Sequence, residues 1–192
     1  MQYNRHYAAI RAQYGERCAA RSGLPLINHI HEGVAVLVAI GSSMRAVEAY
    51  CLHPLLQNDD DVQTAMRSDS AFLQCQADPA AVVLAMEYRR VANAYLSHHY
   101  QGKDDPIALS CLDEVNDMLI ADKVQNRKDF ERRHAESHAE RARLDAYFRH
   151  WLRRLGISES RYWELATMLE SVKAPPAILA ARPEVGFRSI KQ

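Results

Sequence analysis

The chain has 192 residues, of which 48% are hydrophobic, enough for one compact domain with a sizeable core. Its 24 basic side chains balance 24 acidic ones, so no net field favours nucleic acid or a membrane surface. Its four cysteines lack zinc-finger spacing, no apolar run reaches the roughly 20 residues of a membrane span, and the first residues do not resemble a signal peptide. We therefore expect a cytoplasmic protein without a membrane or nucleic-acid partner.

The first break in the helical pattern is the Ser-Gly-Leu-Pro segment at 22–25, because glycine supplies unusual backbone angles and proline disfavours an α conformation in the residue before it. Two apolar helices are predicted next, at 29–40 and 44–53. The first carries His29 near its start, and the second ends at His53. Each segment therefore presents an imidazole on a helix whose other face is apolar.

An acidic run follows at 58–61, before a helix predicted at 62–76. We interpret the run as a solvated loop that caps this helix. A second interpretation is that Asp59 or Asp60 supplies a carboxylate to a reaction. A third, a divalent-ion site made by the run itself, is disfavoured because glycine and a distal glutamate are lacking.

The next helix is predicted at 79–99, with Asp78 as its cap and Pro79 in its first turn. It carries Arg89 close to Tyr88 and Asn93. A guanidinium pairs bidentately with phosphate oxygens, so Arg89 is a candidate for gripping a phosphorylated ligand. The same residues are also usual on an exposed helix.

A carboxylate follows the apolar helix predicted at 107–121. Asp122 comes directly after several large apolar residues, and a carboxylate buried there needs a metal, a histidine or an arginine as partner. Charged helical sequence continues over 123–155, and Ser158 begins a last helix at 159–171. We expect a helical domain at 1–157, and a C-terminal helix and tail at 158–192 that pack on it or extend from it.

Four stretches carry a resemblance to a known family: RSGLPLINH at 21–29, VAVL at 34–37, AYCLHPLLQ at 49–57 and ADKVQN at 121–126. They closely resemble the hydrolase domain of the RelA/SpoT alarmone enzymes, an HD-superfamily fold, over about residues 15–130. The resemblance implies an all-α, HD-domain-like bundle of about seven helices.

The same resemblance implies a ligand set. His29, His53 and Asp122 would hold Mn²⁺ or another divalent metal, if one is bound. His29 is preferred to His31 because it lies 24 residues before His53, as in the family. His31 and Glu32 are kept as candidates for the rim of the pocket.

The nucleotide contacts implied by the resemblance come from two regions. Arg21 is the candidate for stacking on a purine, Asn126 for contacting the nucleotide, and Lys123 for lying beside its phosphates. Arg89 is added from its own helix. The implied ligand is a purine nucleotide of the alarmone type.

One motif departs from the family. Where the family has His-Asp followed by Glu-Asp, this chain has His53-Pro54 followed by Gln57-Asn58. Proline has no donor atom on its side chain, and glutamine and asparagine are not bases near neutral pH. We therefore expect a nucleotide-binding protein whose hydrolysis is lost or altered.

Two alternatives stay open. One is an active metal-dependent nucleotide (pyro)phosphohydrolase that uses Asp59 or Asp60 to orient the nucleophile. The other is a scaffold or oligomerisation domain, and an aromatic stripe at 144–169 leaves room for a homodimer.

Overall fold

A computed structural model of the chain describes residues 4–20, 22–133 and 138–180. Over these ranges the protein is all α and holds no strand, only an isolated bridge between Cys18 and Pro25. The predicted fold class is thus confirmed. The helices are α1 (Arg5–Tyr14), α2 (Ile27–Ala39), α3 (Met44–Leu52), α4 (Asp59–Ala65), α5 (Ala71–Gln74), α6 (Pro79–Ala94), α7 (Asp113–Arg133), α8 (Arg141–Arg154) and α9 (Glu159–Leu169), with short 3-10 helices η1 (His53–Leu56), η2 (Ser97–His99) and η3 (Ala177–Leu179).

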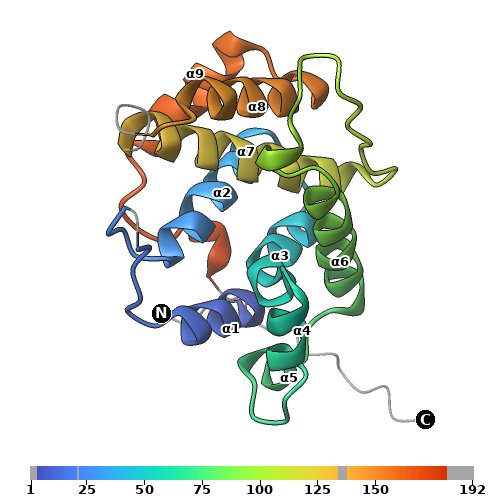
Figure 1. Cartoon of the computed structure of the whole chain (residues 1–192). Helices are drawn as coiled ribbons and strands as arrows, with labels where there is room; N and C mark the ends of the chain where they lie inside the picture. The colour runs from blue at the N-terminus through green and yellow to red at the C-terminus, as the bar shows by residue number, and fades with distance from the viewer. Residues whose placement is uncertain (1–3, 21, 134–137, 181–192) are drawn as a thin grey trace, which may run out of the picture.

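Helix α7 is the central element. It packs against α2, α3, α6, α8 and α9. Figure 1 shows it crossing the molecule, with α8 and α9 on one side and α2, α3 and α6 on the other. Because α7 is covered on both sides, several of its polar side chains are buried along with its aliphatic ones: Asp122, Lys123, Gln125, Arg127 and Lys128. Burial of charge on this scale requires specific partners.

The hydrophobic core lies between α7 and the helices of the N-terminal half. Its fully buried aliphatic members come from several helices and include Ile10, Ile30, Leu37, Leu52 and Met118. Helices α2, α3 and α7 contact one another in pairs, so residues from all three contribute to this core.

The start of α7 differs from its prediction. The sequence predicted a helix at 107–121 that ends just before Asp122, whereas α7 begins at Asp113 and continues through that residue to Arg133. Asp113 and Glu114 lie in its first turn, where carboxylates complement the positive end of the helix dipole. No breaking residue follows Asp122, so this carboxylate projects from the middle of a buried helix.

The helix predicted at 62–76 divides into α4 and α5. Asn58 forms a capping box: its side chain accepts from the Asp61 N–H at 2.9 Å, and the Asp61 carboxylate accepts from the Asn58 N–H at 3.2 Å. This cap starts α4 at Asp59, so the acidic run is the first turn of the helix. Ser70 then caps α5. In contrast, the predicted helix starts at Asp78-Pro79 and after Ser158 are confirmed.

Helix α9, in the region predicted as a C-terminal addition, packs on α7 and α2. The Arg127 guanidinium is fully buried and forms two hydrogen bonds with the Glu159 carboxylate, at 2.8 and 3.0 Å. In the part of the chain that the structure describes, no helix combines the length and the apolar character needed to cross a membrane.

Candidate metal centre

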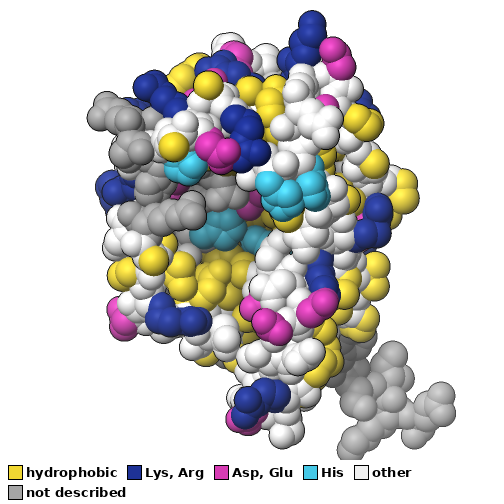
Figure 2. Space-filling model, viewed as in Figure 1, with side chains coloured by type: hydrophobic (Ala, Val, Ile, Leu, Met, Phe, Trp, Pro, Cys, Tyr) yellow, Lys and Arg dark blue, Asp and Glu magenta, His cyan; other side chains and the backbone are white. Residues whose placement is uncertain are grey.

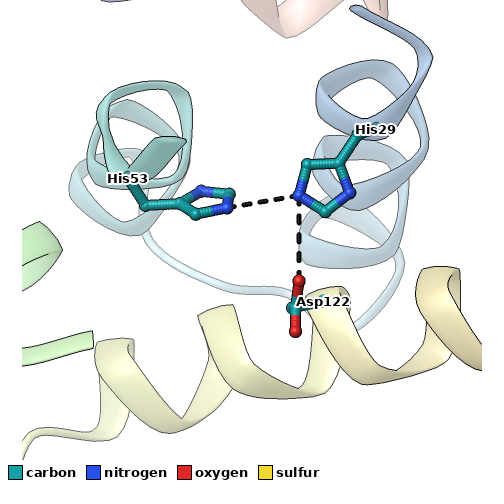
Figure 3. Close-up of side chains that lie close together, drawn as sticks. All are labelled: His29, His53 and Asp122. Carbon is teal, nitrogen blue, oxygen red and sulfur yellow. Dashed lines mark hydrogen bonds and ion pairs between the residues drawn. The ribbon is translucent and has the colours of Figure 1, made fainter. Parts of the chain in front are cut away.

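Three side chains converge from three segments of the fold. His29 lies in the first turn of α2, His53 begins η1 directly after α3, and Asp122 lies on α7, with the side chains directed toward one another (Figure 3). The His29 Nε2 is 3.2 Å from the His53 Nε2 and 3.7 Å from the Asp122 Oδ1. Their candidate ligand atoms all lie within 4.8 Å of one another. The structure therefore brings together the three residues that the sequence suggested as metal ligands.

The orientation of the His53 ring is set by the backbone. Its Nδ1 lies 2.6 Å from the Tyr50 carbonyl oxygen, which can only accept a hydrogen bond, so Nδ1 carries the hydrogen. Burial, with a contribution from nearby His29, lowers the pKa of His53 from 6.5 to about 3. The ring is therefore neutral near pH 7 and directs the lone pair of its Nε2 toward His29.

The His29 ring is oriented by a side chain on α7. Its Nδ1 lies 2.9 Å from the Gln125 Oε1, and the Gln125 nitrogen donates to the Asp129 carboxylate at 2.6 Å. Because a carboxylate accepts and does not donate, the amide must present its oxygen to His29. His29 then donates from Nδ1, and in its neutral form it leaves the Nε2 lone pair facing His53.

Asp122 supplies the negative charge. Its Oδ2 accepts from the Lys123 ammonium at 2.9 Å, and its Oδ1 from the Asn126 amide at 2.8 Å. Burial opposes ionisation of this carboxyl, but Lys123 and the two histidines outweigh it and lower the pKa of Asp122 to about 2. The group is therefore a carboxylate near neutral pH.

The arrangement fits a first-row divalent cation. Two imidazole nitrogens 3.2 Å apart, beside a carboxylate, form a set of donor atoms that a divalent cation can occupy. Imidazole and carboxylate are the donors that manganese and zinc accept, and hydrogen bonds from the far side of each imidazole are typical of metal ligands. Three protein ligands leave coordination positions for water or a substrate oxygen.

The three ligands line a cavity of about 540 Å³. Figure 2 shows this face of the molecule hollowed, with histidine side chains at the bottom of the hollow and hydrophobic side chains along one wall. The residues that line the cavity besides the three ligands include Gln13, Tyr14, Arg17, Leu26, Gln57, Asp61, Phe72, Tyr88, Asn93, Leu96, Lys123 and Asn126. The cavity thus combines polar groups near the ligands with an apolar and aromatic wall.

Two of the predicted nucleotide contacts line this cavity. Lys123 and Asn126 both do so, but each already donates to Asp122. The Lys123 ammonium is buried and lies 5.2 Å from the centre of the Trp151 ring. Both residues therefore hold the carboxylate in place.

Among the described residues, Arg89 and the acidic candidates Asp59 and Asp60 do not line the cavity. Arg89 on α6 pairs with Asp59 on α4, and neither residue is part of the cavity wall. Asp60 is exposed and is also absent from the wall. Arg21 lies outside the described residues.

His31 and Glu32 face away from the metal centre. The His31 Nε2 and the Tyr7 hydroxyl form a hydrogen bond of 2.8 Å, and the Glu32 carboxylate accepts from the Lys128 ammonium at 2.5 Å. Neither belongs to the wall of the candidate site, and Glu32 instead lines a separate cavity with Asn28.

Several wall residues were not candidates from the sequence. Arg17 lies at the mouth, where its guanidinium donates to the carbonyl oxygens of Gln13 and Tyr14. Asp61 is the carboxylate of the acidic run that reaches the wall. The motif at 53–58 that drew attention to Gln57 in the sequence was a usable signal, whereas nothing in the pattern around Arg17 indicated its place.

Comparisons of the chain with protein-family models, with curated proteins and with solved structures found no match.

Proposed function

We propose that the chain binds a phosphorylated purine nucleotide of the alarmone type at a divalent metal held by His29, His53 and Asp122, with hydrolysis lost or altered. The observation that carries the proposal is the convergence of two imidazole nitrogens and an ionised carboxylate at the wall of a cavity of about 540 Å³. Manganese is the ion that the resemblance to the RelA/SpoT hydrolase domain favours.

The cavity suits a ligand with an apolar ring system and a phosphate. Its volume falls within the roughly 300–1,000 Å³ of ordinary small-molecule sites. Leu26, Phe72 and Leu96 supply an apolar wall for a base, and Arg17 at the mouth supplies a cation that can pair with phosphate. The metal's open positions would accept further phosphate oxygens.

The groups near the ligands favour binding over turnover. The family's acidic pair is replaced by Gln57 and Asn58, and the Gln57 amide donates to the Asn93 side chain at 3.1 Å. Neither amide can take a proton from water near neutral pH. Apart from Asp122, the carboxylate found on the wall among the described residues is Asp61, whose Oδ2 accepts the capping hydrogen bond of α4.

The first test is metal binding. Mn²⁺ titration followed by calorimetry, with metal content measured by mass spectrometry, should give one ion per chain. His29→Ala and Asp122→Asn should weaken binding at least 100-fold, while His31→Ala, a buried histidine on the same helix, should retain it. Absence of binding by the wild type would overturn the proposal.

The second test is nucleotide binding. Guanine and adenine nucleotides should raise the melting temperature in the presence of Mn²⁺, because a ligand at about 100 times its Kd stabilises the folded state by about 2.7 kcal/mol. The same nucleotides should have little effect on Asp122→Asn. Binding without release of phosphate or pyrophosphate is the result expected of a sensing or sequestering protein.

A metal-dependent nucleotide (pyro)phosphohydrolase is the second candidate. The observation that favours it is Asp61, a carboxylate on the wall of the same cavity, beside a centre with open metal positions. Mn²⁺-dependent turnover that requires His53 and Asp122 would establish this function. Absence of any response to metal or nucleotide would leave a scaffold or a homodimer.

A further inference from the structure

The Tyr50 side chain contacts the candidate metal centre from the buried side. The side chain is completely buried on α3, and its hydroxyl oxygen lies 3.3 Å from the His29 Nε2. Its ring centre lies 4.5 Å from that of His53. Tyr50 is not among the residues that line the cavity, so the hydroxyl contacts His29 from within the core.

The direction of the hydrogen bond follows from the tautomers. His29 uses its Nδ1 hydrogen on Gln125, so in its neutral form the Nε2 can only accept. The Tyr50 hydroxyl must then donate to it. A phenol has an ordinary pKa near 10, so the hydroxyl keeps its hydrogen near neutral pH.

Gly33 makes room for this hydroxyl. A Cβ at Gly33 on α2 would lie 2.2 Å from the Cε1, Cζ and hydroxyl oxygen of Tyr50, closer than any two such atoms can approach. Glycine is the least favourable residue for a helix interior after proline. Glycine at position 33 therefore allows the Tyr50 ring to pack against α2 and its hydroxyl to reach His29.

We propose that the Tyr50 hydroxyl is a placeholder for the metal: in the metal-free protein it donates its hydrogen to the His29 lone pair, and cation binding displaces that hydrogen bond. The inference rests on the proposed metal centre and adds a residue that sets its affinity. Tyr50 is a positioning residue, since it acts through His29. Its hydrogen bond keeps the His29 imidazole in the orientation that a metal ligand needs, and lowers the affinity for the ion because it must be broken on binding.

The test is Tyr50→Phe, which deletes one oxygen and keeps the ring. Removing a hydrogen bond that exists only in the metal-free state should tighten Mn²⁺ or Co²⁺ binding roughly two- to tenfold. The matched control is Tyr7→Phe. The Tyr7 hydroxyl also forms a hydrogen bond with a histidine Nε2 of α2, that of His31, at 2.8 Å, but this pair lies away from the candidate metal centre. The control should leave metal affinity unchanged.

A second variant and a second readout make the test independent of folding effects. Gly33→Ala should force the Tyr50 ring away from His29 and tighten metal binding in the same direction, with some loss of stability. In metal-free protein, the ¹⁵N spectrum of the histidines should show the His29 Nε2 resonance moving downfield in Tyr50→Phe, because its lone pair loses a donor. The His31 resonance should move only in Tyr7→Phe.

Each result discriminates. Unchanged affinity and an unchanged His29 resonance in Tyr50→Phe would overturn the placeholder. Affinity that falls tenfold would also overturn it, and would make the hydroxyl a ligand. Failure of the proposed metal centre has a different signature, since neither wild type nor Tyr50→Phe would then bind Mn²⁺, Co²⁺ or Zn²⁺.

Discussion

Gln125 presents its amide oxygen to the His29 Nδ1 at 2.9 Å and thereby directs the other ring nitrogen into the candidate metal centre. The two residues are 96 positions apart in the chain and meet where α2 packs on α7. Hydrogen bonds of this kind orient metal ligands and raise their basicity, so they are coupled to metal affinity.

Gln125→Leu should therefore weaken Mn²⁺ binding about 10- to 100-fold without removing a ligand. Calorimetric titration measures the change. Gln57→Leu is the control, because Gln57 lines the same cavity and bonds to Asn93 but contacts none of the three ligands by a hydrogen bond. An equal loss in both variants would mean that Gln125 has no specific role at His29.

Asp61 is expected to matter more than Asp59 or Asp60 if the protein hydrolyses nucleotides. Asp61 lines the cavity, whereas Asp59 pairs with Arg89 and Asp60 is exposed. Asp61→Asn should lower kcat at least 100-fold, the low end for removing a general base, while the double change Asp59→Asn with Asp60→Asn should stay within about twofold. Initial rates of phosphate release measure both. A large loss of kcat in the double variant and a small one in Asp61→Asn would instead assign the role to Asp59 or Asp60, as the sequence suggested.

Arg127 should be critical for stability. Its guanidinium is fully buried between Glu131 and Glu159 and lies 3.8 Å from the centre of the Tyr162 ring. Arg127→Met removes the cation from Glu131 and leaves Arg149 as the cation beside Glu159, so it should lower the free energy of unfolding by about 3 kcal/mol in urea denaturation, the low end for breaking a buried pair.

The control for Arg127 is a surface pair on the same helix. Arg132 pairs with Glu170 but is exposed, so Arg132→Met should cost no more than about 1 kcal/mol. Similar losses for the two variants would show that the buried network does not join α7 to α9.

Stability should fall as the pH is lowered below about 6.5. The pKa of His53 is lowered to about 3 and that of His31 to about 4, both chiefly by burial. Below pH 6.5 these histidines become protonated in the unfolded chain but stay neutral in the folded chain. Each one therefore lowers the free energy of unfolding by up to about 1.4 kcal/mol per pH unit, until the pH reaches its folded-state pKa. The contribution of these histidines to the free energy of unfolding is therefore fully present above pH 6.5 and is progressively lost as the pH falls toward 4.

Urea unfolding between pH 7.5 and 4.5, with a chelator present, tests this slope. His53→Gln should flatten it by removing one of the buried histidines that cause it; His6, whose pKa burial also lowers, remains. A free energy of unfolding that is constant over this range would contradict the burial of neutral imidazoles at both positions.

Local signals in the sequence predicted much of the secondary structure. The Asp78-Pro79 start of α6 and the start of α9 after Ser158 depend on contacts within one turn, which adjacent residues reveal. The start of α4 was wrong by three residues, because the capping box of Asn58 with Asp61 outweighed the expectation of a solvated acidic loop. That shift also decides that Asp61, and not Asp59, faces the cavity.

The sequence by itself determined the all-α class and selected His29, His53 and Asp122, since apolar periodicity, spacing and motif wording are properties of short stretches. Only the tertiary structure decided which groups surround those three. Gln125, Tyr50 and Gly33 acquire their roles from the approach of α2 to α3 and α7, and Arg17 from its place at the mouth of the cavity. Hydrogen bonds act over about 3 Å, so their partners are fixed by how the helices pack and not by the distance along the chain.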